Sequence, residues 1–255
     1  MSSLEASNVT INSSSTSAGL GVTLKGGSFA DTITVNGVTG TTSMVLTGDL
    51  GLGTDTVTVN GGPYGGTATQ TISLADLKNY ETSNLTGSIG KDVIIGGVGA
   101  DRIAGGRGQD TLTGGAGADQ FYFSKGSSTS SSPDVITDFS AGTSGDRITG
   151  DATTIATTVT TGTNLTISNG VVTFTATQTS LVGAATTVSN AVTTDGHMAL
   201  FTYGGKSYAF IADGSAGLAD TDILVELTGV VLPSTALSST ADSVTSYTGL
   251  SGFGA

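Results

Sequence analysis

Residues 87–122 read GSIGKDVII, GGVGADRIA, GGRGQDTLT and GGAGADQFY, which are four consecutive nonapeptides of one form. The form is G-G-x-G-x-D-x-U-x, where U is a large apolar residue, and the first copy departs from it only in having Ser88 as its second residue. A fixed short period is typical of a solenoid, in which each repeat stacks on its neighbours. The phased positions are four aspartates and four apolar residues: Asp92, Asp101, Asp110 and Asp119, and Ile94, Ile103, Leu112 and Phe121.

The two halves of the nonapeptide favour different structures. Glycines let the backbone turn through conformations closed to residues with a Cβ, so carbonyl oxygens can converge on one locus. The aspartate adds a charged oxygen there, and calcium takes about six to eight oxygen ligands. The x-U-x half predicts a short strand whose central side chain faces inward.

Two nonapeptides complete one coil, so turns two repeats apart are expected to superpose. We therefore expect Asp92 to pair with Asp110, and Asp101 with Asp119, with each ion between two stacked turns. The alternative is a glycine-rich loop or a similar solenoid without metal. Stacked aspartates would then repel one another and the glycines would cost backbone entropy, which favours the calcium interpretation.

These repeats resemble the calcium-binding repeats of the RTX (repeats-in-toxin) family of secreted bacterial proteins. The resemblance implies a parallel β-roll that folds on calcium outside the cell after type I secretion. It also implies a ligand set made of glycine and x-position carbonyls together with the aspartates. On this sequence that set is Asp92, Gly96, Gly97, Val98, Gly99, Asp101, Gly105, Gly106, Arg107, Gly108, Asp110, Gly114, Gly115, Ala116, Gly117 and Asp119.

Two degenerate copies lie upstream, GGSFADTIT at residues 26–34 and LGLGTDTVT at residues 50–58. Asp31 and Asp55 are candidate calcium ligands, but neither has an intact partner two repeats away, so their occupancy is left open. The TITVNG and TVTVNG stretches that contain the last residues of these copies predict longer strands. Between the second copy and the regular block, the spacing of Leu74 and Leu77 predicts a short helix with Ser73 as its N-cap.

Downstream, DVITDFSAGTSGDRI at residues 134–148 resembles the segment that closes the roll in many RTX proteins. Asp134 and Asp138 are candidate ligands of an end site, with simple surface solvation as the alternative. A hairpin is expected at Gly204 and Gly205. The C-terminal residues SYTGLSGFGA are where the family would carry an uncleaved secretion signal.

The whole chain is expected to be all-β. We predict irregular β-solenoid coils over residues 1–86, a regular RTX β-roll over 87–123, and a β-sandwich-like capping and C-terminal domain over 124–255. The segments YETSNLTG and DGSAGLADTDILVELTGV resemble parts of RTX-type surface-layer proteins.

Composition excludes several classes of function. The 255 residues include 20 acidic side chains against 8 Lys and Arg, a net charge of −12, so a nucleic-acid partner is not expected. There is no cysteine and a single histidine, His197, which removes thiolate and histidine-based catalytic metal sites. No catalytic or organic-cofactor residues are predicted. No apolar run is long enough to span a membrane, and no conventional signal peptide is expected.

Two functions remain. The first is a secreted structural protein that assembles with its own copies into a surface layer, filament or matrix in the presence of calcium, with a cell-surface polysaccharide as a further candidate partner. The second is the C-terminal calcium-binding and type I secretion or targeting module of a larger RTX enzyme, adhesin or toxin. Both place the chain outside the cell or at its surface.

Overall fold

A computed structural model describes residues 8–12, 20–37, 43–61, 70–140, 145–150, 154–155, 158–162, 164–168 and 170–232. It divides the chain into two compact units, Met1–Gln120 and Phe121–Ala255. The sequence predicts three regions, at residues 1–86, 87–123 and 124–255. The division into two units does not test these boundaries, so they stay a prediction.

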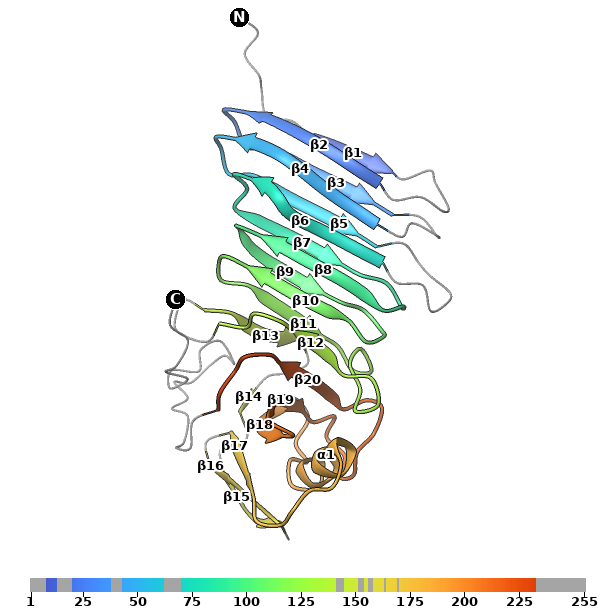
Figure 1. Cartoon of the computed structure of the whole chain (residues 1–255), viewed down its shortest axis with the longest axis vertical. Coiled ribbons are helices and arrows are strands. Elements are labelled where there is room, and N and C mark those ends of the chain that lie inside the picture. The colour runs from blue at the N-terminus through green and yellow to red at the C-terminus, as the bar shows by residue number, and fades with distance from the viewer. Residues whose placement is uncertain are drawn as a thin grey trace, which may run out of the picture. The chain divides into compact units, whose positions relative to one another are not determined.

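The first unit is a parallel β-roll, as predicted. Successive strands alternate between two sheets, and in Figure 1 the strands of each sheet lie one above the other along the roll. One sheet has the order β1 (Asn8–Asn12), β3 (Thr32–Asn36), β5 (Thr56–Asn60), β7 (Thr82–Thr86) and β9 (Ala100–Ala104). The other has the order β2 (Leu20–Gly27), β4 (Ser43–Gly51), β6 (Gln70–Lys78), β8 (Asp92–Gly97) and β10 (Thr111–Gly115).

The core of the roll consists of stacked columns of apolar side chains. Alternate residues of a strand face inward, and parallel register places each of them on its counterpart in the next coil. In one sheet the column is Val35, Val59, Leu85 and Ile103, all 0% exposed. In the other sheet it is Met44, Ile72, Ile94 and Leu112, also 0% exposed. The predicted inward position of the repeat is thereby confirmed.

The outer face of the sheet that contains β1, β3, β5 and β7 carries Thr and Asn side chains that match from coil to coil. Thr56 and Thr82 hydrogen-bond across adjacent coils. The amide of Asn60 donates to Asn36 at 2.8 Å, and that of Asn36 donates to Asn12 at 2.9 Å. These ladders let neighbouring coils stack closely without repulsion between like charges.

The predicted helix with Ser73 as its N-cap is wrong, because residues 70–78 form strand β6. Between two register pairs of β4 and β6, β4 advances from Val45 to Thr47 while β6 advances from Ser73 to Asp76. This β-bulge adds one residue to β6, so Leu74 and Leu77 both point inward three residues apart. The bulge therefore imitates the spacing of a helix.

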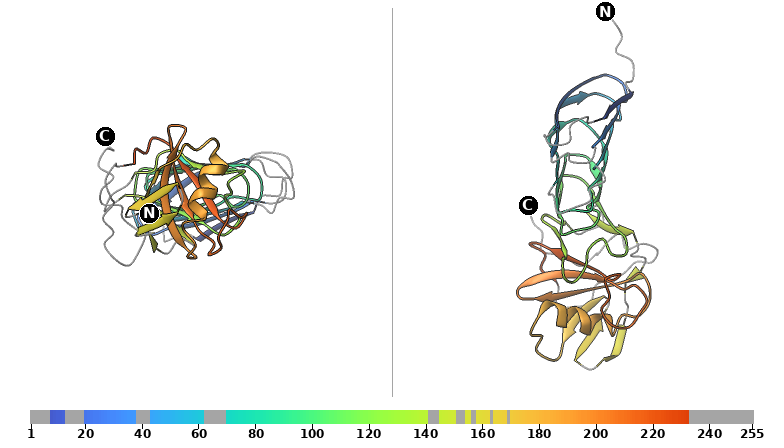
Figure 2. Two further views of the ribbon diagram at one scale, coloured as in Figure 1. Left: turned by 90° about the horizontal axis from the view of Figure 1, so that it is seen from below. Right: turned by 90° about the vertical axis from the view of Figure 1, so that its right-hand side faces the viewer.

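The second unit contains a mixed sheet with a helix against it (Figure 2). Helix α1 (Leu181–Ser189) is capped by Ser180, whose side chain accepts the N–H of Gly183. Buried residues of α1 pack with those of β18 and β19 in one apolar core. The sheet order is β15 (Thr158–Gly162), β16 (Leu165–Ser168), β17 (Val171–Phe174), β18 (His197–Tyr203), β19 (Lys206–Ile211), β20 (Ile223–Leu227) and β12 (Asp134–Ile136), and β14 (Thr154–Ile155) pairs with β18. Strands β11 (Gln120–Phe123) and β13 (Arg147–Gly150) are neighbours of each other and are not part of this mixed sheet.

The hairpin predicted at Gly204 and Gly205 is confirmed. Tyr203 pairs with Lys206 across it, and both glycines have positive φ, 59° and 79°. The β-sandwich-like capping role of this unit stays a prediction, and the helix in it was not anticipated. The residues proposed as a secretion signal lie outside the described part of the chain.

We expect Leu85→Ala to destabilise the roll by about 2–5 kcal/mol, because it leaves a cavity in a column with no solvent access. Asn84→Ala is the control, since Asn84 is the exposed neighbour in the same strand. Urea unfolding in saturating calcium measures both. Equal effects of the two changes would contradict the stacked apolar column.

Candidate metal centre

The aspartates of the nonapeptides are stacked as predicted. The backbone N–H of Asp92 donates to Oδ1 of Asp110 at 2.8 Å, and that of Asp101 donates to Oδ1 of Asp119 at 2.9 Å, each across 18 residues. All four side chains are at most 1% exposed. Each contact holds the carboxylate of Asp110 or Asp119 directly beside the preceding coil, in a buried position among the stacked turns.

Glycine turns surround these carboxylates with backbone oxygens. A Cβ added at Gly96 would lie closer than 3.0 Å to the Asp101 carboxylate and to the carbonyl oxygen of Gly114 in the next coil. Gly106 and Gly108 have φ of 101° and 129°, conformations that side chains rarely allow. The repeat therefore needs these glycines both to turn and to let one coil approach the other.

The first, degenerate repeat replaces part of this arrangement with a hydroxyl. The N–H of Ser88 donates to Asp92 Oδ2 at 2.5 Å, and its hydroxyl lies within 3.1 Å of both carboxylate oxygens. The N–H of Gln70, one coil earlier, donates to Asp92 Oδ1 at 3.1 Å. Ser88 thus helps to fix the carboxylate that stacks on Asp110.

Two further residues position Asp101 and were not identified from the sequence. Ser83 donates its hydroxyl to Asp101 Oδ1 at 2.7 Å, and the Tyr80 hydroxyl donates to Oδ2 at 3.4 Å. Burial raises the pKa of Tyr80 well above its usual range, so the phenol stays protonated and can donate. A sequence signal existed, because Ser83 occupies the register position of Asp101 in the preceding coil.

Burial shifts the ionisation of these carboxyls. Desolvation raises the pKa of Asp110 to about 7, partly opposed by the Asp92 N–H and reinforced by the charge of Asp92. Desolvation also raises the pKa of Asp101 to about 6, against hydrogen bonds from Ser83, Gly97 and Tyr80. The charged forms are therefore costly unless a cation lies beside them.

The chemistry of these groups fits calcium. Within the described residues, no three or more His, Cys, Asp or Glu side chains gather into a metal-binding group. A site here must therefore combine the two carboxylates of a stacked pair with backbone carbonyl oxygens, which is the hard-oxygen environment that calcium prefers. Both kinds of oxygen meet at two glycines: the Asp92 carboxylate and the Gly105 carbonyl oxygen at Gly87, and the Asp101 carboxylate and the Gly114 carbonyl oxygen at Gly96.

Comparison with protein families agrees with this geometry. Residues 86–121 and 95–129 match the model of the RTX calcium-binding nonapeptide repeat, which describes four copies. The block is a set of RTX calcium-binding repeats. RTX nonapeptide repeats bind Ca²⁺ and are typical of secreted bacterial proteins, so calcium is the metal of this block. Comparison with curated proteins finds no match to the chain.

The individual ligands within the RTX block stay predictions. The aspartates meet at the stacked edge, whereas the carbonyl of Gly97 accepts the N–H of Ala116 at 2.8 Å and so links two coils directly. The side chain of Val98 is 53% exposed, which leaves only its backbone as a candidate donor.

The candidates outside the RTX block fall into two groups. Asp134 is buried in β12, whereas Asp138 is exposed beyond the end of that strand, and the end site stays a prediction. Asp31 and Asp55 are both buried, and the N–H of Asp31 donates to Asp55 Oδ1 at 2.7 Å. The expectation that these two lack a partner is therefore wrong, because the coil there is 24 residues long and they are partners of each other.

We expect Asp110→Asn to raise the calcium concentration at half-saturation about tenfold, corresponding to about 1.4 kcal/mol of ion binding. Asparagine keeps an oxygen for the Asp92 N–H but removes the charge. Asp76→Asn is the matched control, because Asp76 is exposed in the same unit. Isothermal titration with calcium measures both, and an unchanged Asp110→Asn titration would remove Asp110 from the ligand set.

The raised pKa of Asp110 predicts a pH dependence of the calcium-free chain. A folded-state pKa of about 7, above the ordinary 3.8, means that this carboxyl favours folding fully below about pH 3.8. That contribution is lost as the pH rises to about 7. We therefore expect circular dichroism in calcium-free buffer to show more β-structure at pH 5 than at pH 7.5. The difference should shrink in Asp110→Asn but not in Asp76→Asn; equal pH profiles would contradict the assignment.

Proposed function

We propose that the chain is an extracellular structural protein that folds on calcium and assembles with copies of itself at a cell surface. The observation that carries the proposal is the stacked pair of buried aspartates in the RTX block, joined across 18 residues. A fold with ionised carboxylates at that depth needs a divalent ion between its coils. Calcium then links coil to coil, so folding and binding are one event.

The location of the protein follows from the same coupling. Cytosolic calcium is too low to neutralise the stacked carboxylates, and the chain would stay largely unfolded and competent for export. External calcium then stabilises the folded state by mass action. Type I secretion is the route we propose. Across the described residues, no helix has the length and apolar character needed to cross a membrane.

The terminal strands of the two sheets, β1 and β2, favour self-association. β1 pairs with β3 alone and β2 with β4 alone within the described residues, so each is the last strand of its sheet. β1 is mostly exposed. Unpaired backbone groups of an edge strand are a ready template for another chain. The Asn12–Asn36–Asn60 ladder also ends at β1 and could continue into a neighbouring copy.

Catalysis forms no part of the proposal, since the chain has one histidine and no cysteine. The second candidate is a calcium-binding secretion or targeting module of a larger protein. It is favoured by the presence of a separate unit with its own apolar core after the roll. A cell-surface polysaccharide is a further partner that either function could use.

We expect purified chain in millimolar calcium to form ordered sheets or fibres under the electron microscope. Chelation should dissolve them and remove most of the β-signal in circular dichroism. Asp110→Asn should shift both transitions to higher calcium, whereas Asp76→Asn should shift neither. A folded chain that stays monomeric by light scattering at all calcium concentrations would support the module instead, and an unchanged β-signal on chelation would refute calcium-coupled folding.

A further inference from the structure

The upstream coils contain a turn pair with the same geometry as the RTX block, outside the residues that match the family model. The lower turn is residues 26–31 and the upper turn is residues 50–55. The N–H of Asp31 donates to Asp55 Oδ1 at 2.7 Å, as Asp92 does to Asp110 at 2.8 Å. The coil is 24 residues long instead of 18, yet the contact between the two aspartates is the same.

The backbone around this pair also matches. A Cβ at Gly26 would lie closer than 3.0 Å to the Leu50 carbonyl oxygen and to the Asp31 carboxylate. Gly96 stands in the same relation to the Gly114 carbonyl and to Asp101. At both places a carboxylate of the lower turn lies beside a carbonyl oxygen of the upper turn, and the aspartate of the upper turn accepts an N–H of the lower turn.

The upper turn has the two glycines with positive φ that the RTX turns have. Gly51 and Gly53 have φ of 92° and 146°, where Gly106 and Gly108 have 101° and 129°. The N–H of Leu52 donates to the Gly27 carbonyl at 2.9 Å, as that of Arg107 donates to Ser88 at 3.0 Å. The turns at residues 26–31 and 50–55 therefore share two hydrogen bonds and two backbone conformations with the turns of the RTX block.

Phe29 stands where the lower turn would have its third glycine, and the structure shows why this is tolerated. The equivalent residue of a lower RTX turn, Gly99, does not have positive φ. The position therefore accepts a side chain on conformational grounds, and that of Phe29 is 50% exposed. One difference remains in the upper turn, where Leu50 replaces the first glycine and directs its side chain into the core, 1% exposed.

A buried oxygen indicates that this pair is incomplete without a ligand. Asp55 is 0% exposed, and its Oδ2 has no hydrogen-bond partner among the described residues. Burial raises the pKa of Asp55, opposed by the Asp31 N–H and reinforced by the nearby carboxylates of Asp31 and Glu81. An ionised carboxylate at this depth needs a positive charge beside it.

We propose that a further calcium ion binds between residues 26–31 and 50–55, held by the carboxylates of Asp31 and Asp55 and by backbone oxygens that include the Leu50 carbonyl. The next pair of acidic residues along the roll, Asp55 and Glu81, does not repeat the site. In that pair residues 50–55 form the lower turn, and Leu50 stands at the position that Gly26 has in the proposed site. The wide coils therefore contribute one ion beyond those of the RTX block. This inference uses the proposed calcium chemistry but concerns separate residues.

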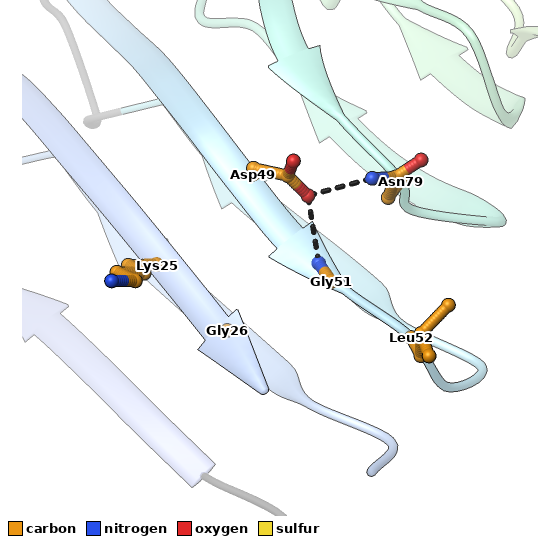
Figure 3. Close-up of a pocket in the computed structure, with 6 residues that line it drawn as sticks. All are labelled: Lys25, Gly26, Asp49, Gly51, Leu52 and Asn79. Carbon is orange, nitrogen blue, oxygen red and sulfur yellow. Dashed lines mark hydrogen bonds between the residues drawn. The ribbon is translucent and has the colours of Figure 1, made fainter. Parts of the chain in front are cut away.

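Asp49 provides a matched control in the same coil. Its carboxylate accepts hydrogen bonds from Asn79 at 2.7 Å and from the Gly51 N–H at 2.9 Å, at the edge of a surface pocket lined also by Lys25, Gly26 and Leu52 (Figure 3). These bonds, that of Asn79 first, lower the pKa of Asp49. Asp49 is thus a satisfied surface carboxylate immediately before the proposed turn.

The test is the number of calcium ions bound per chain, counted by native mass spectrometry of the full chain. Asp55→Asn should bind one ion fewer than the wild type, and Asp49→Asn the same number as the wild type. Asp110→Asn should weaken binding only in the RTX block, and the double variant with Asp55→Asn should show both losses. An unchanged ion count in Asp55→Asn overturns the inference, whereas an unaffected Asp110→Asn overturns the proposed RTX ligand instead.

A second measurement uses the unaltered chain, so that a folding defect in a variant cannot decide the matter. Crystals grown in calcium should give an anomalous difference peak between Asp31 and Asp55. Peaks in the RTX block with none between these two residues would overturn the inference.

Discussion

The roll depends on one contact, in which a backbone N–H of one coil donates to the carboxylate of an aspartate in the next. The contact fixes the register of the two coils and also buries a negative charge. It occurs between Asp92 and Asp110, between Asp101 and Asp119, and again between Asp31 and Asp55. With only 8 Lys and Arg in the chain, side chains cannot neutralise these charges, so a bound divalent ion is the natural counter-charge.

Coil length varies along the roll while this contact does not. The aspartate-to-aspartate distance is 24 residues upstream and 18 in the RTX block. Part of the extra length lies in one sheet, where strands β2 and β4 have eight and nine residues whereas β8 and β10 have six and five.

The sequence predicted what depends on a short exact period. Repeat phase was enough to place the RTX turns, the inward apolar residues and the stacked aspartates. Prediction from the repeat phase failed where the structure departs from the nine-residue period. The bulge in β6 gives Leu74 and Leu77 a helical spacing. The nonapeptide period predicts partners 18 residues apart, so it does not predict the pairing of Asp31 with Asp55 across 24 residues. Helix α1 lies among Thr-rich strands and has little amphipathic pattern, and only its cap at Ser180 marks its start.

The two turns of a pair do not make equal demands on the sequence. Positive φ is required at both glycines of the upper turn, as at Gly106 and Gly108, but not at the equivalent residues of the lower turn. Within the three aspartate–aspartate pairs, the two departures from glycine at these positions are Ser88 and Phe29, and both lie in lower turns. A lower turn can therefore lose a glycine and keep its carboxylate in place, since these positions do not need positive φ. A motif that demands every glycine in every copy will miss such half-degenerate pairs, and physical stacking rather than motif completeness is the better criterion for calcium sites in this roll.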